Sequence, residues 1–154
     1  MEYEINIYRR PDKDVIGRIK EIAELLTERW FTDNVPEDTE RDLLFQDVVC
    51  LSVNDEIVSF IMFTCLDGTI NISLMGTDPN FRGKGLGTII MNYFITYVRS
   101  LEFEAIKLFT VPPDAKSSYK ETIGFYEKNG FKIIKRYTEL WENGAIELVK
   151  NLEE

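Results

Sequence analysis

The sequence predicts an α/β (α+β) domain that is built around a mixed, mostly antiparallel sheet with one parallel step. Three observations predict this fold. Short runs that are typical of strands alternate with amphipathic helical segments along the chain. Three of the strand-like runs follow one another with only turn residues between them, as in an antiparallel meander. A helix separates the next two strand-like runs, which favours a parallel pair with a right-handed crossover.

The first part of the chain predicts a strand and two helices. Apolar and polar residues alternate over residues 3–7, which indicates a strand. Apolar residues then recur at helical spacing from Asp12 to Trp30, and Asp12 can cap the start of this helix. A loop over Phe31–Pro36 leads into a short second helix that ends near Phe45.

The meander follows. Its three strands are predicted over Val48–Val53, Ile57–Cys65 and Thr69–Thr77. Asn54-Asp55-Glu56 and Leu66-Asp67-Gly68 separate them, and both separators carry residues that favour tight turns.

The last part of the chain adds the parallel step and a final hairpin. The predicted segments are a helix over Gly85–Leu101, a strand over Ala105–Val111, a helix that ends at Asn129-Gly130, and strands over Phe131–Trp141 and Ala145–Leu152 that are joined at Asn143-Gly144. The complete order is β-α-α-β-β-β-α-β-α-β-β. No repeat or linker interrupts it, so we expect one domain over residues 1–154.

Composition excludes several classes of function. The chain has 154 residues, 44% of them hydrophobic, which is enough for a real core. Its net charge of −9 disfavours a nucleic-acid partner, because phosphate contacts need a concentrated basic face. Histidine is absent, so a Ser-His-Asp relay and a His-based metal site are both excluded. We expect no metal.

Two further expectations concern the location of the protein and its cysteines. The longest apolar stretches are only a few residues, far short of the roughly 20 that a membrane span needs, and the N-terminus lacks the features of a secretory signal. We therefore expect a cytoplasmic protein with no membrane partner. Cys50 and Cys65 lie inside apolar runs, which favours two small buried side chains over a disulfide.

The loop before the helix at Gly85 is the most informative segment. Gly83, Gly85 and Gly87 lie within five residues, and Arg82 and Lys84 add positive charge. Small residues let backbone N–H groups converge on one point, and the start of a helix adds unpaired donors. These features favour a phosphate-binding loop over an ordinary tight turn. The spacing fits neither the P-loop nor the dinucleotide fingerprint.

Residues 82–87, Arg-Gly-Lys-Gly-Leu-Gly, resemble the signature Arg/Gln-x-x-Gly-x-Gly/Ala of the GNAT acetyltransferases. Asp78-Pro79 resembles the strand-exit turn of that family, and residues 125–131, Phe-Tyr-Glu-Lys-Asn-Gly-Phe, resemble its second hallmark, a Tyr before Gly-Phe. The predicted order of elements matches the GNAT fold along essentially the whole chain. The resemblance implies that the two parallel strands splay apart around the pantetheine arm of acetyl-CoA.

The same resemblance implies roles for single residues. Backbone groups of Met75 and Thr77 would bond the pantetheine amides, the N–H groups of the glycine-rich loop would hold the pyrophosphate, and Tyr126 would protonate the departing thiolate. A phenol suits this task because its ordinary pKa is about 10, so it stays protonated at neutral pH. The alternative for Tyr126 is a core aromatic. Tyr119 stands where many relatives carry an Asn that contacts the cofactor. The full set expected at the cofactor is Met75, Gly76, Thr77, Arg82, Gly83, Lys84, Gly85, Leu86, Gly87, Thr88 and Tyr119.

An amine must lose a proton before it attacks a thioester, but the strand before the loop carries no carboxylate. Asp78 is the nearest candidate for the base, Glu139 and Glu142 are others, and a water chain is an alternative.

The resemblance places the acceptor beside the connection between the first two helices. We expect Trp30, Phe31, Asp33 and Glu37, with Asp38 next to them, to contact it. Aromatic faces and carboxylates suit a cation, although these acids could equally serve the start of the second helix.

The sequence therefore predicts an N-acetyltransferase that moves an acetyl group from acetyl-CoA to a primary amine, small and cationic or carried by a peptide, in a ternary complex. A homodimer is compatible with this prediction. The alternatives are a non-catalytic acyl-CoA-binding regulator and an acyl carrier for longer chains.

Overall fold

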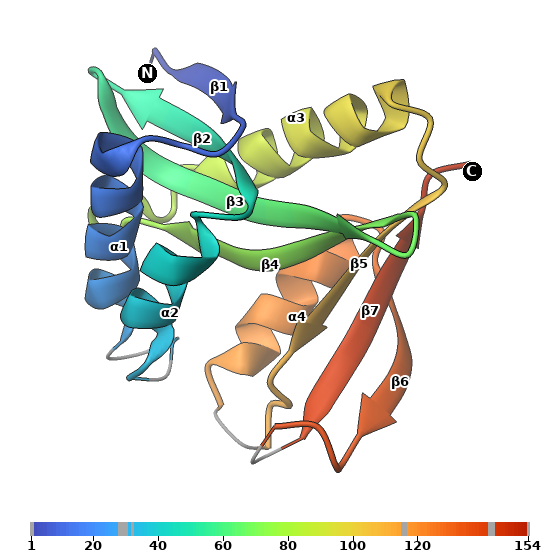
Figure 1. Cartoon of the computed structure of the whole chain (residues 1–154). Helices are drawn as coiled ribbons and strands as arrows, with labels where there is room; N and C mark the ends of the chain where they lie inside the picture. Colours follow the sequence, from blue (N-terminus) through green and yellow to red (C-terminus); the bar gives the residue numbers. More distant parts are fainter. Residues whose placement is uncertain (1, 28–30, 32, 115–116, 142–143, 154) are drawn as a thin grey trace.

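The computed structural model of the chain describes residues 2–27, 31, 33–114, 117–141 and 144–153. Within them, seven strands form one mixed sheet in the order β1-β2-β3-β4-β5-β7-β6 (Figure 1). Every neighbouring pair is antiparallel except β4 and β5. The strands are β1 Glu4–Tyr8, β2 Asp47–Val53, β3 Glu56–Leu66, β4 Thr69–Thr77, β5 Ala105–Thr110, β6 Lys132–Tyr137 and β7 Ala145–Asn151. The predicted fold class and order of elements are confirmed.

Helices cover both faces of the sheet, with α1 and α2 on one side and α3 and α4 on the other (Figure 1). They are α1 Lys13–Thr27, α2 Val35–Asp42, α3 Leu86–Ser100 and α4 Tyr119–Lys128. A short 3-10 turn, η1 Pro79–Phe81, follows β4 and was not predicted. None of the helices in the described part of the chain is both long and apolar enough to cross a membrane.

Each face of the sheet carries its own apolar core, because successive side chains of a strand point to opposite faces. On the first face, Ile19 and Ile22 of α1 pack with Phe60 and Met62 of β3. On the second face, Phe94 of α3 joins the core that includes alternate residues of β3, β5 and β7. Side chains of α1 therefore form the core on one face of the sheet, and side chains of α3 and α4 form the core on the other face.

The turns of the meander are as the sequence predicts. Asn54 and Asp55 between β2 and β3 have φ values of 52° and 65°, and Asp67 and Gly68 between β3 and β4 have 54° and 74°. Two consecutive positive φ values are what a two-residue type I′ hairpin turn requires.

β4 and β5 pair over three residues only and then separate. Ile70 pairs with Ile106 and Ile72 with Leu108, where the parallel ladder ends. β4 continues beside β3 as far as Thr77, while β5 continues beside β7 (Figure 1). The predicted splay of the parallel pair is therefore present, and it opens toward the carboxyl ends of both strands.

Two expectations need correction. The strand predicted over Phe131–Trp141 ends at Tyr137, because Leu140 and Trp141 are exposed and lie in turns rather than on the sheet. Cys65 is exposed, because it lies near the end of β3 beside the exposed turn to β4; Cys50 is buried, and both thiols are free. The predicted helix end at Trp30 and the turn residue Asn143 lie outside the described residues.

Candidate active site

The gap between the diverging strands opens into a cleft of about 780 Å³. Its floor comes from β4 and β5, and helices α2 and α4 form its two sides. The residues that these four elements contribute are Ile72–Gly76, Leu108–Thr110, Val35, Asp38, Thr39, Asp42, Tyr119, Thr122 and Tyr126. The family resemblance places the acceptor beside α2, so we call the α2 side of this cleft the acceptor side.

The backbone groups of β4 point alternately toward β3 and toward the cleft. The Gly76 carbonyl accepts a hydrogen bond from Ser59 Oγ of β3 at 3.3 Å, and the Asp78 N–H donates to Val58 O at 2.7 Å. Both residues thus direct their backbone toward β3. Because backbone direction alternates along a strand, Met75 and Thr77 direct theirs toward the gap. This is the edge on which the resemblance placed the pantetheine amides.

Gly76 itself is required by packing. A Cβ at this position would lie 2.7 Å from Leu26 Cδ1 of α1 and 3.1 Å from Phe60 Cε1. The glycine therefore lets α1 lie close against β4 at the edge of the cleft.

The glycine-rich loop lies beyond η1 and leads into α3. We call residues 82–88 the cradle. Gly83 and Gly85 have φ values of +77° and +76°, a left-handed conformation that side chains rarely adopt. Gly85 is the N-cap of α3 and its first turn receives no side-chain cap and contains no acidic residue. The N–H groups of Leu86, Gly87 and Thr88 are consequently first-turn donors without intrahelical acceptors. A site of this kind suits a phosphate.

The charged residues of the cradle differ in position. Both Arg82 and Lys84 are exposed, but only Arg82 lines the cleft. Gly87 sits against the ring of Phe125 of α4, where a Cβ on the glycine would lie 3.4 Å from Phe125 Cε1. The cradle therefore contacts α4, the helix that carries Tyr126.

Tyr119 and Tyr126 line the cleft from α4. Both are buried, with exposed fractions of 9% and 7%. Burial raises the pKa of Tyr126 far above its ordinary value of about 10, and Tyr119 raises it further. The Tyr126 ring packs edge-on against Phe125 and Phe131, each at 5.6 Å between centroids. Its phenol is thus a neutral donor that is held in a fixed orientation at the cleft.

The acceptor side is acidic, but only one of the carboxylates that the sequence singled out, Asp38, lines it. Phe31 is buried and lines the cleft, whereas Asp33 and Glu37 are exposed and lie outside its lining. Trp30 lies outside the described residues. The carboxylates at the cleft are Asp38 and Asp42.

Asp42 was missed, although the sequence carried a signal for it. Asp38 and Asp42 are four residues apart on α2, so both lie on one face of the helix. Desolvation raises the pKa of Asp42, and the charge of Asp38 raises it further. Trp141, from the last hairpin, also lines the cleft and was not expected there.

The candidate base Asp78 is not brought into the cleft. It is 3% exposed, one oxygen accepts from Asn80 N and the other lies 2.8 Å from Arg18 Nη2. Glu139 is exposed and bonds to Thr138, and Glu142 lies outside the described residues. No three His, Cys, Asp or Glu side chains gather into a metal site in the parts of the chain described above.

Comparison with known proteins agrees with this geometry. The model of the acetyltransferase (GNAT) family matches residues 19–131. Mycothiol acetyltransferase from Propionibacterium freudenreichii subsp. shermanii is 30% identical over 63 residues, which are 41% of this chain and 19% of that protein. The matched segment thus spans about a fifth of the relative's length.

Solved structures share the whole fold. An acetyltransferase of the GNAT family from Desulfovibrio desulfuricans superposes with a TM-score of 0.83 at 13% identity, over 97% of this chain and 99% of the other. The PaiA N-acetyltransferase from Thermoplasma acidophilum, solved in complex with coenzyme A, superposes with a TM-score of 0.72 at 14% identity, over 98% and 99%.

Proposed function

The chain belongs to the GNAT family of acetyltransferases, and from that premise we propose that it transfers the acetyl group of acetyl-CoA directly to a primary amine bound on the acceptor side of the cleft. One observation carries the proposal. The splay between β4 and β5 opens beside the cradle and runs to Tyr126, so a phosphate site, a strand-like groove and a proton donor share one cleft.

Acetyl-CoA fits the residues present. The cradle offers the first-turn N–H groups of α3 and the charge of Arg82 to the pyrophosphate. Met75 and Thr77 offer backbone groups to the two amides of the pantetheine arm. Tyr119 closes the α4 side of the groove.

The acceptor is held opposite the cradle. Asp38 and Asp42 attract an ammonium group, and Phe31 and Trp141 supply aromatic surface for the rest of a cationic acceptor. The cationic amine, small or carried by a peptide, is therefore the class of substrate that this side of the cleft favours.

The reaction needs three proton movements. The ammonium group first loses a proton, and Asp42 receives it through water, since its raised pKa makes it a better proton acceptor than an ordinary aspartate. The free amine then attacks the thioester carbonyl, which forms the C–N bond and breaks the C–S bond. Tyr126 donates its proton to the departing thiolate, and the nitrogen of the new amide loses its second proton, which restores the Tyr126 phenol.

Asp78 is assigned a different role. Its carboxylate is buried in contacts away from the cleft, so we propose that it shapes the turn before the cradle rather than acting as the base.

An acetylation assay over a panel of amines tests the proposal, with release of the CoA thiol as the readout. We expect turnover with cationic primary amines, and faster turnover than with neutral or acidic ones. Tight binding of CoA without turnover on any amine would instead support a non-catalytic acyl-CoA-binding domain.

A further inference from the structure

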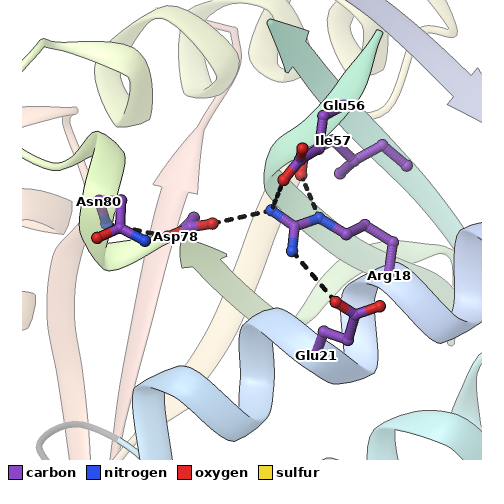
Figure 2. Close-up of polar contacts among 6 residues, drawn as sticks. All are labelled: Arg18, Glu21, Glu56, Ile57, Asp78 and Asn80. Carbon is purple, nitrogen blue, oxygen red and sulfur yellow. Dashed lines mark hydrogen bonds and ion pairs between the residues drawn. The ribbon is translucent and has the colours of Figure 1, made fainter.

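Arg18 of α1 joins three segments that are far apart in the sequence (Figure 2). Its Nε donates to Ile57 O at 2.7 Å, and its Nη2 lies 2.8 Å from both Glu56 Oε1 and Asp78 Oδ2. Glu21 on α1 is a looser partner, at 3.6 Å from Nη1. The Arg18 side chain is only 17% exposed. One guanidinium therefore faces three carboxylates, and the contact with Asp78 is its most buried.

Asp78 in turn fixes how the chain leaves β4. Its N–H donates to Val58 O at 2.7 Å, which ends the pairing of β4 with β3. Its Oδ1 accepts from Asn80 N at 2.9 Å, and its carbonyl accepts from Phe81 N at 2.8 Å. These three bonds define η1, and the cradle begins at the next residue, Arg82.

We propose that Arg18 is a positioning residue for acetyl-CoA: it holds Asp78, and through Asp78 it sets the direction in which the cradle leaves the sheet. The inference rests on the proposed function, because it assigns acetyl-CoA to the cradle. Arg18 itself does not line the cleft, so its effect passes through the η1 turn.

The charges of the two side chains explain why the contact between Arg18 and Asp78 controls the position of the cradle. A carboxylate that is 3% exposed is stable there only while it is paired. Without the guanidinium, Asp78 faces Glu56 and Glu21 with no counter-charge from α1, and it gains by turning toward water. That movement breaks the bond to Asn80 N and releases the turn that carries the cradle.

The first experiment measures binding of CoA by calorimetry, which requires no acceptor. Arg18→Gln and Asp78→Asn should each weaken CoA binding at least tenfold. The double variant should be no weaker than either single one, because both remove the same contact. Arg18→Lys keeps the charge and should recover part of the affinity. Glu21→Gln changes a partner of Arg18 that does not touch Asp78, and it should bind CoA like the parent.

The second experiment separates positioning from stability. In steady-state assays Arg18→Gln should raise the KM for acetyl-CoA at least tenfold and change kcat and the amine KM by less than about threefold. Amide hydrogen exchange over residues 80–88 should be faster than in the parent, while exchange in β3 is unchanged.

The outcomes are distinct. A lower melting temperature with unchanged CoA affinity in the folded Arg18→Gln protein would overturn the proposal and leave the network a purely structural one. If Arg18→Gln does not fold, Asp78→Asn and Arg18→Lys give the same comparison. Failure of the parent protein to bind CoA would contradict the proposed function itself, and it would be seen before any variant is made.

Discussion

Tyr119 and Tyr126 lie two helical turns apart on α4, and both side chains line the cleft from the same face of that helix. Burial raises the pKa of both phenols, and the pair reinforces the effect at Tyr126. A phenol with a raised pKa keeps its proton at neutral pH. Tyr126 is therefore protonated at neutral pH, as the proposed role of donor to the thiolate requires.

Tyr126→Phe should lower kcat by about 10²–10⁴, because it removes only the hydroxyl that we propose as the general acid. The KM for acetyl-CoA should change little, since the ring contacts with Phe125 and Phe131 remain. Thiol release at saturating substrates measures the loss. Tyr93→Phe, at an exposed tyrosine of α3, is the matched control. If Tyr126→Phe retains most of its turnover, water or another group protonates the thiolate.

Alkaline pH should destabilise the protein in part through Cys50. Burial raises the pKa of this thiol from about 9 to about 12. Above pH 9 the unfolded chain releases the proton while the folded chain retains it. The stabilising contribution is therefore complete below pH 9 and is lost as pH rises toward 12.

Urea unfolding at pH 8 and pH 10.5 measures this effect. The unfolding free energy should drop less between these two pH values in Cys50→Ala than in the parent. The difference between the two drops should be about 1.4 kcal/mol or less per pH unit, the limit for one titrating group. Cys65→Ala, at the exposed cysteine, should keep the drop of the parent. An equal drop in all three proteins would show that Cys50 does not titrate differently on unfolding.

Gly85 offers a direct test of the cradle. Any side chain at its φ of +76° is strained, although Asn and Asp tolerate this conformation better than other residues. Gly85→Asp and Gly85→Asn thus share the strain and differ in charge. CoA should bind at least tenfold more weakly to the Asp variant than to the Asn variant, since the carboxylate faces the phosphates. Calorimetry that gives both variants the same Kd would contradict the phosphate assignment.

The sequence predicted the fold well because its signals are local. Turn residues such as Asn54-Asp55, the Asp12 cap and the glycines of the cradle each specify the backbone within a few positions. Asp12 Oδ1 indeed accepts from Val15 N at 3.0 Å. The splay followed from the family resemblance and is confirmed by the short β4–β5 ladder.

The site was predicted less completely because it depends on contacts between distant segments. Asp78 stands beside the cradle in the sequence, but its direction is decided by Arg18, sixty residues away. Asp33 and Asp42 both flank the acceptor side in the sequence, and only the packing of α2 against α1 decides which one meets the cleft. The spacing of residues along a chain does not predict which distant segments contact one another.

The acidic acceptor side should act by contact rather than through the overall charge of −9. Asp38→Asn/Asp42→Asn and Asp33→Asn/Glu37→Gln each remove two negative charges near α2. Only the first pair lines the cleft. At physiological ionic strength the Debye length is about 8 Å, so exposed charges outside the cleft are largely screened. The Asp38/Asp42 variant should therefore raise the KM of a cationic amine at least tenfold and leave that of acetyl-CoA within about twofold.

The Asp33/Glu37 variant should change neither KM by more than about twofold. Equal increases of the amine KM in both variants would show that long-range charge attracts the acceptor. No increase of this KM in either variant would remove α2 from the acceptor site.

Of the two carboxylates that line the cleft, Asp42 should matter more for kcat. Asp42→Asn should lower kcat more than Asp38→Asn does, because the amide cannot take the proton of the ammonium group. The deficit of Asp42→Asn should shrink as pH rises, since more of the amine then arrives already deprotonated.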